Sequence, residues 1–119
     1  NMMNKEKNCL EEVESFDKTG FNHTLSLING KYKLTILYAI YRHKVIRYND
    51  LKRYLDIISH KTLSLNLKEL EKDDLVKRKE YHQIPPKVEY SLSEKGKSFI
   101  PILYAMCEWG ENHQDNKKK

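Results

Sequence analysis

Apolar residues recur along much of the chain at the spacing of α-helices. Leu25 and Ile28 share one face of a segment from Phe21 to Ile28, which stops at Asn29-Gly30, a favourable helix end. Between about Lys31 and Tyr41, apolar side chains cover most of the helical circumference. We therefore expect this second segment to be a central helix that is buried on most sides.

A short strand and a pair of helices are predicted next. Val45-Ile46-Arg47 is short and β-branched, as a small strand requires. A helix is predicted from about Asn49 to Leu55, and Asp56-Ile57-Ile58 forms a three-residue turn. Ser59 is a strong N-cap for a helix that runs to about Asp73. The core stripe of that helix follows the spacing i, i+4 and i+7: Leu63, Leu67 and Leu70.

The last third of the chain predicts a hairpin and a long helix. Residues alternate between apolar and charged from Leu75 to Tyr81 and from Val88 to Leu92, as in strands. His82 to Lys87 contains two prolines and is predicted to be the hairpin loop. Ser93 opens a helix to about Asn112, which Pro101 should bend or offset.

This order of elements predicts a winged helix-turn-helix, a mainly α fold with a small β-hairpin wing (α+β). Residues 1–18 are expected to be an N-terminal extension, in which Leu10 to Phe16 have the spacing of a short helix. Residues 19–113 are predicted to form the winged domain with a C-terminal dimerisation helix. The polar residues 114–119 are predicted to be a disordered tail.

The amino-acid composition limits the classes to which this protein can belong. The 119 residues, 39% hydrophobic and 33% charged, fit one domain that buries a core without disulfides or metals. No apolar run approaches the roughly 20 residues of a membrane span, and the polar start of the chain resembles no secretory signal. The two cysteines, Cys9 and Cys107, have neither disulfide-framework nor zinc spacing. We expect a cytoplasmic protein without membrane contact, metal or cofactor.

Catalytic chemistry is hard to assemble from these residues. The five histidines are scattered without metal-ligand pairing, and the four glycines form no phosphate-binding loop. No Ser/His/Asp arrangement is supported by spacing. We expect a binding protein and not an enzyme. The formal net charge of +5 is compatible with nucleic acid.

The helix that follows Ser59 carries residue types that read DNA on its outward face. Lysines contact guanine edges or phosphates, hydroxyl and imidazole groups donate or accept, and a leucine packs on a thymine methyl group. A solvated face with one stray leucine is the alternative. The predicted DNA-binding residues of this helix are Ser59, His60, Lys61, Ser64, Leu65 and Lys68.

Further basic residues are predicted to contact phosphates. On the hairpin these are Arg78, Lys79, His82 and Lys87, although an ordinary charged hairpin would look the same. Lys31 and Lys33 lie at the start of the central helix, where free N–H groups also attract anions. A winged helix that binds a protein instead of DNA is a further alternative, against which these lysines argue.

Several segments resemble the HxlR-type, MarR-like winged-helix transcription regulators. The likeness covers about residues 19 to 113 and is very specific in the PPKVEYSL element. It implies a bacterial or archaeal regulator that binds a palindromic operator as a homodimer, built from the N-terminal helices and the long C-terminal helix. The matching segments are 27–34 (LINGKYKL), 48–51 (YNDL), 59–71 (SHKTLSLNLKELE), 85–92 (PPKVEYSL) and 107–110 (CEWG).

The final helix also carries more apolar residues than one small domain needs, which together with the resemblance predicts a dimer. The alternative is that this helix closes its own core. The predicted dimer contacts are Phe21, Leu25, Ile102, Leu103, Met106 and Trp109.

The inducing signal is left open by the sequence. Redox-sensing members of the resembled family carry a cysteine that aligns with Thr19, so that thiol is absent. Cys9 lies ten residues earlier, among lysines that favour a thiolate and glutamates that oppose it. A thiol- or quinone-responsive repressor using Cys9 is one hypothesis, and another small-molecule or oxidant inducer is a second. Cys107 is expected to pack as a small hydrophobic residue.

Overall fold

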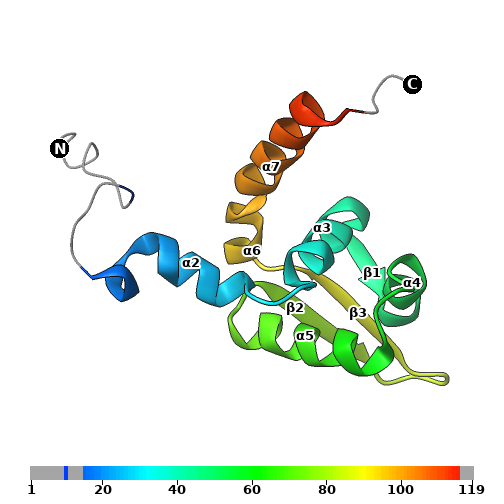
Figure 1. Cartoon of the computed structure of the whole chain (residues 1–119). Helices are drawn as coiled ribbons and strands as arrows, with labels where there is room; N and C mark the ends of the chain where they lie inside the picture. Colours follow the sequence, from blue (N-terminus) through cyan, green and yellow to red (C-terminus); the bar gives the residue numbers. More distant parts are fainter. Residues whose placement is uncertain (1–9, 11–14, 116–119) are drawn as a thin grey trace. The chain divides into compact units, whose positions relative to one another are not determined.

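The computed structural model describes residue 10 and residues 15–115 (Figure 1). The chain divides into two compact units, Asn1–Lys31 and Tyr32–Lys119. The first contains a short 3₁₀ helix, η1 (Phe16–Lys18), and α2 (Gly20–Ile28). Most of the helix predicted over Leu10 to Phe16 lies outside the described residues.

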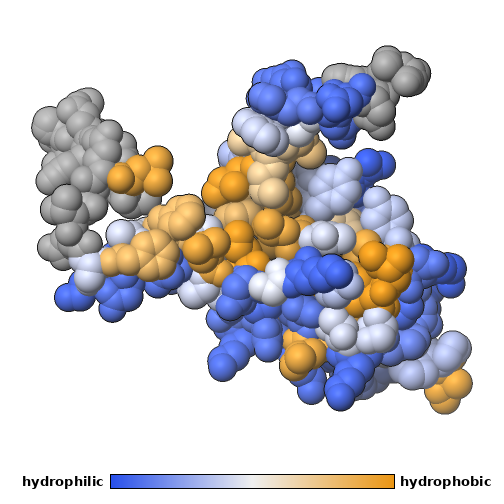
Figure 2. Space-filling view, in the orientation of Figure 1, coloured by the Kyte–Doolittle hydropathy of each residue, from blue (hydrophilic) through white to orange (hydrophobic). Residues whose placement is uncertain are grey.

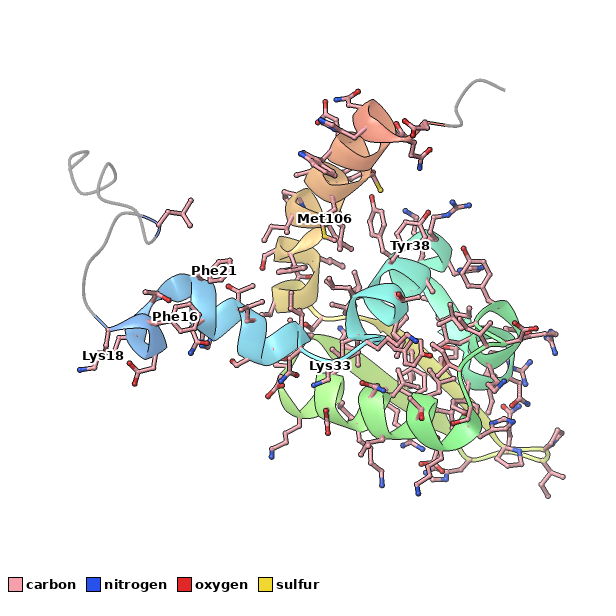
Figure 3. The ribbon with its side chains drawn as sticks, viewed as in Figure 1. Phe16, Lys18, Phe21, Lys33, Tyr38 and Met106 are labelled. Atoms are coloured by element: carbon pink, nitrogen blue, oxygen red, sulfur yellow. The ribbon has the colours of Figure 1, made fainter. Side chains whose placement is uncertain are left out.

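A cap and an aromatic pair organise the first unit. The Thr19 side chain accepts a hydrogen bond from the Asn22 backbone N–H (3.0 Å), so α2 begins at the residue after Thr19. The rings of Phe16 and Phe21 meet edge to face at 6.1 Å, side by side in Figure 3. None of the residues of α2 is buried, which leaves Phe21 and Leu25 exposed.

The second unit is built around α3 (Lys33–His43), the predicted central helix. Ile36, Leu37 and Ile40 of α3 are fully buried. The helix begins two residues later than Lys31, the predicted start, and it packs on the sheet and on the following helices. This confirms the expectation of a buried central helix.

The predicted helix pair is present as α4 (Tyr48–Tyr54) and α5 (His60–Lys72). The Ser59 hydroxyl accepts from the Thr62 N–H (3.1 Å), so Ser59 is the N-cap that its residue type predicts. The leucines of the predicted stripe, Leu63, Leu67 and Leu70, are completely buried and hold α5 against the core.

Three antiparallel strands form one sheet in the order β1-β3-β2: β1 (Val45–Arg47), β2 (Val76–Tyr81) and β3 (Lys87–Leu92). Ser91 pairs with Val45 on one side and with Lys77 on the other, and Tyr90 pairs with Ile46 and Arg78. Because side chains alternate along strands, Tyr90 and its partners share one sheet face and Ser91 and its partners share the other. We call these the inner and the outer face.

The final segment forms two helices, α6 (Glu94–Ser98) and α7 (Ile100–His113), where one bent helix was predicted. Pro101 lies in the first turn of α7, where its missing N–H leaves no bond unmade. Ser93 caps α6 by accepting from the Gly96 N–H (2.9 Å). Within the described ranges, no helix is both long and apolar enough to cross a membrane.

Candidate nucleic-acid interface

The exposed face of α5 is the first element of the candidate interface. With the leucine stripe turned into the core, His60, Lys61, Ser64, Leu65 and Lys68 are all exposed on the other side. Leu65 is 54% exposed although it is apolar. The structure thus brings together the residues predicted for this face, and their contact with DNA stays a prediction.

Tyr48, at the start of α4, is part of this site and was missed by the sequence analysis. Its hydroxyl lies 3.0 Å from Nδ1 of His60 and 3.2 Å from Oγ of Ser64, within hydrogen-bonding distance of both. The rings of Tyr48 and His60 also stack at 5.9 Å. These contacts join the first turns of α5 to α4. They also occupy one polar atom of His60 and one of Ser64, both of which are predicted DNA-binding residues.

A groove of about 420 Å³ separates α5 from the inner face of the sheet. Arg78 of β2 reaches into it from the strand side and forms an ion pair with Glu80 (3.3 Å). Its hydrogen bond to the Tyr90 hydroxyl raises the pKa of Arg78, so the guanidinium stays charged. Burial raises the pKa of Tyr90, which Arg78 partly offsets. The groove is lined by Tyr48, Ser64, Lys68, Glu71, Arg78 and Tyr90.

The basic residues of the wing do not form one cluster. Arg78 lies on the inner face, whereas Lys79 and Lys87 lie on the outer face, where their amino groups sit 4.9 and 4.2 Å from the Tyr81 ring centroid. Lys87 also pairs with Glu89 at 3.6 Å. His82 is exposed in the loop between the strands. Strand alternation, which separates neighbours in sequence, explains this division.

The prediction that Lys33 contacts phosphates is wrong. Its side chain is 6% exposed, and its Nζ lies 2.7 Å from Oε1 of Glu69 on α5 (Figure 3 labels Lys33 at the start of α3). A buried ammonium group needs such a partner, because desolvation alone is costly. Lys33 therefore joins α3 to α5 inside the domain. Lys31 is exposed and precedes α3.

Among the dimer contacts predicted on α7, the structure corrects Leu103. It is 8% exposed and belongs to the core of its own domain, because it lies on the face of α7 that meets α3. Ile102, Met106 and Trp109 are exposed, and hydrophobic surface runs along α7 in Figure 2.

Cys107 is also exposed, contrary to the expected packing. It lines a hollow of about 270 Å³ between α3 and α7, with Tyr38 and Met106, both labelled in Figure 3. Cys9, the predicted redox residue, lies outside the described residues. Across the described part of the chain, no three His, Cys, Asp or Glu side chains are grouped to hold a metal ion.

Comparison with known proteins identifies the family. Residues 27–118 match the HxlR-like helix-turn-helix family. The chain belongs to this family. An uncharacterized HTH-type transcriptional regulator of Halalkalibacterium halodurans is 52% identical over 105 residues, 88% of this chain and 93% of the relative. The match confirms the predicted family and the helix-turn-helix transcriptional regulator class.

Solved structures of regulators share the fold of this HxlR-like protein. A MarR-family regulator from Porphyromonas gingivalis superposes with a TM-score of 0.79 at 32% identity, over 87% of this chain and 100% of the other. The redox regulator HypR in its reduced form gives a TM-score of 0.76 at 42% identity, over 82% and 95%. The predicted winged helix-turn-helix of the α+β class is confirmed.

Proposed function

We propose that this HxlR-like regulator binds double-stranded operator DNA with α5 in the major groove and the β2–β3 wing beside it. The observation that carries the proposal is the exposed face of α5, where two lysines flank an exposed leucine opposite a fully buried leucine stripe. The major groove is about 12 Å wide and admits one helix. The role is binding, without a catalytic step.

The two sides of the interface contribute differently to affinity. Lys61, Leu65 and Lys68 are exposed, and neither lysine pairs with a carboxylate of the described residues, so they supply base and phosphate contacts from α5. Arg78, Lys79, His82 and Lys87 supply phosphate contacts from the wing, which add affinity without reading sequence. The groove lined by both Lys68 and Arg78 joins α5 to the inner face of the wing.

The proposal includes a homodimer that binds a palindromic operator. Its support is the apolar surface of α7, on which Ile102, Met106 and Trp109 are between 47% and 66% exposed. Apolar area of this kind on one helix favours a partner, and a two-fold axis makes the same patch meet itself. Two copies of α5 would then read half-sites about one helical turn apart. Phe21 and Leu25 are the candidate contacts from α2.

A thiol-responsive repressor is the second candidate function. The redox regulator HypR in its oxidized form is 43% identical over 80% of this chain. Cys107 is exposed, and Cys9 is the other thiol. Diamide should weaken DNA binding of the wild type, and Cys9→Ser or Cys107→Ser should remove that response. Unchanged affinity after oxidation would exclude this mode, leaving a small-molecule inducer.

Matched relatives include bacterial and archaeal proteins, and the proposed place of action is the cytoplasm, where their DNA lies.

Fluorescence anisotropy with a duplex from the region upstream of the gene tests the DNA-binding proposal. The wild type should bind this duplex at least about tenfold more tightly than a scrambled one. Lys61→Ala combined with Lys68→Ala should remove most of that difference, because each charged contact is worth about 1–3 kcal/mol. Lys18→Ala, at an exposed residue of η1, is the control for loss of a positive charge away from α5. Equal losses in both variants would refute the assignment of α5.

A further inference from the structure

A third cavity, of about 480 Å³, opens on the outer face of the sheet. Its lining comes from the end of α3, all three strands and α6, so segments distant in the sequence build it together. We call it the outer pocket. Its volume lies within the range of small-molecule sites. The residues that matter here are Tyr41, Lys44, Val45, Lys77, Ser91 and Lys97.

The strand register places this pocket away from α5. Val45, Ser91 and Lys77 lie side by side across the sheet and point to the outer face. Tyr90 and Arg78, one position along, point instead to the groove beside α5. The outer pocket therefore lies on the sheet face opposite α5 and Arg78, and the wing residues Lys79 and Lys87 share its face without lining it.

Three lysines line the outer pocket, and none of its lining residues is acidic. Lys44 and Lys77 pair with no carboxylate of the described residues, and Lys97 pairs at 3.4 Å only with the highly exposed Glu94. Glu89, an acidic residue on the outer face, is engaged by Lys87 at 3.6 Å and by the Tyr81 hydroxyl. A concave site with several ammonium groups attracts anions, because lysine acts as a point charge for phosphate or carboxylate.

Lys44 is held at the pocket rim by an unusual backbone conformation. Its φ of 65° and ψ of −60° lie in a region that residues other than glycine rarely adopt. Such conformations persist where the surroundings enforce them, and they gather at binding sites. The Tyr41 hydroxyl is paired with Tyr104 at 3.0 Å, which leaves the lysines and Ser91 as the polar groups for an occupant.

We infer that the outer pocket binds a small organic anion with at least two negative charges, of the phosphorylated or polycarboxylate class. The lysines hold the charged groups, the Ser91 hydroxyl donates a hydrogen bond, and Val45 offers an apolar wall for the uncharged part. This site shares no lining residue with the groove beside α5, so anion binding is measured in the absence of DNA.

Isothermal titration of the full chain with pyrophosphate and with citrate, at matched ionic strength, tests the inference. The wild type should bind at least one of them saturably, at one site per chain. Lys77→Gln should weaken binding about tenfold or more, because it removes a charge-assisted contact. Lys79→Gln lies two residues along the same strand face, outside the pocket, and should change affinity less than about twofold. A preference for pyrophosphate assigns the phosphorylated class, and a preference for citrate the polycarboxylate class.

Three results would overturn the inference. The first is the absence of saturable binding by either anion, and the second is equal weakening by Lys77→Gln and Lys79→Gln, which would indicate general charge attraction. The third comes from DNA titration: if Lys77→Gln lowered duplex affinity as much as Lys68→Ala, this pocket lysine would be a DNA contact. If the wild type bound no DNA, the proposed function would fail, but the measured anion binding would still support the outer pocket as a ligand site.

Discussion

The Tyr48 hydroxyl lies 3.0 Å from Nδ1 of His60, the first residue of α5. This contact joins α4 to α5 where the proposed DNA-binding surface begins. The same hydroxyl reaches Ser64 at 3.2 Å. A helix that reads bases needs a fixed orientation, because misplaced side chains lose their hydrogen-bond geometry. Tyr48 thus holds two residues of the surface in place from outside α5.

Replacing Tyr48 by phenylalanine should therefore weaken operator binding about three- to tenfold. The ring and its packing on His60 remain, and only the hydroxyl contacts, worth about 0.5–1.5 kcal/mol each, are lost. Tyr54→Phe, on the same helix, is the control, since the Tyr54 ring packs on His43 without needing its hydroxyl. Anisotropy titrations measure both. Equal effects of the two variants would contradict the role given to Tyr48.

The Lys33–Glu69 pair predicts an asymmetric response to mutation. Glu69→Gln leaves a buried ammonium group without its counter-charge and should lower the free energy of unfolding by about 2–3 kcal/mol. Lys33→Met leaves a carboxylate that is 47% exposed and still hydrated, and should cost about 1 kcal/mol or less. Urea denaturation measures both values. If Lys33→Met lowered the free energy of unfolding more than Glu69→Gln does, desolvation of the lysine would not be the dominant energetic term.

Gly96 and Gly110 provide a matched pair for testing the joint between the sheet and α6. A Cβ at Gly96 would overlap the backbone carbonyl of Leu75, whereas a Cβ at Gly110 meets nothing. Gly96→Ala should destabilise the domain by about 1–3 kcal/mol, and Gly110→Ala should stabilise it by about 0.5–1 kcal/mol. Thermal unfolding gives the sign of each change. Stabilisation by Gly96→Ala would contradict the close approach.

The apolar surface of α7 predicts how the dimer can be dissociated. Trp109→Asp should convert the proposed dimer to a monomer in sedimentation velocity, because it places a charge on the exposed patch, while Asn112→Asp should not. Leu103→Ala should instead lower stability by about 2–5 kcal/mol, as expected for a core leucine. A monomeric wild type, or a Trp109→Asp variant that stays dimeric, would remove α7 from the interface.

Local patterns in the sequence predicted most of the fold. The leucines at i, i+4 and i+7 located α5 and its buried face, and the hydroxyl of Ser59 located its start. Alternation and paired prolines located the wing, because strand period and proline chemistry are local properties. The exposed face of α5 followed directly from the buried one.

The details that were wrong or missed depend on contacts between distant segments. In the sequence Lys33 has the pattern of a surface lysine, and only the fold brings Glu69 beside it. No periodicity in the sequence relates α3 to α5. Leu103 and Ile102 are neighbours with the same chemistry, and only the packing of α7 separates buried from exposed. Tyr48 carries a signal that could have been used, since an aromatic residue at the start of the first helix of the pair faces the start of the second.

The most direct test of the central claim, that the exposed face of α5 reads DNA, is to map amide chemical shifts of the ¹⁵N-labelled protein as upstream duplex is added. The largest changes should fall on Lys61, Ser64, Leu65 and Lys68, with further changes in the wing at Arg78 to Lys87. Ser91 and Lys77, on the outer face of the sheet, should change little. Changes centred on Ser91 and Lys77, or none at saturating duplex, would contradict the account.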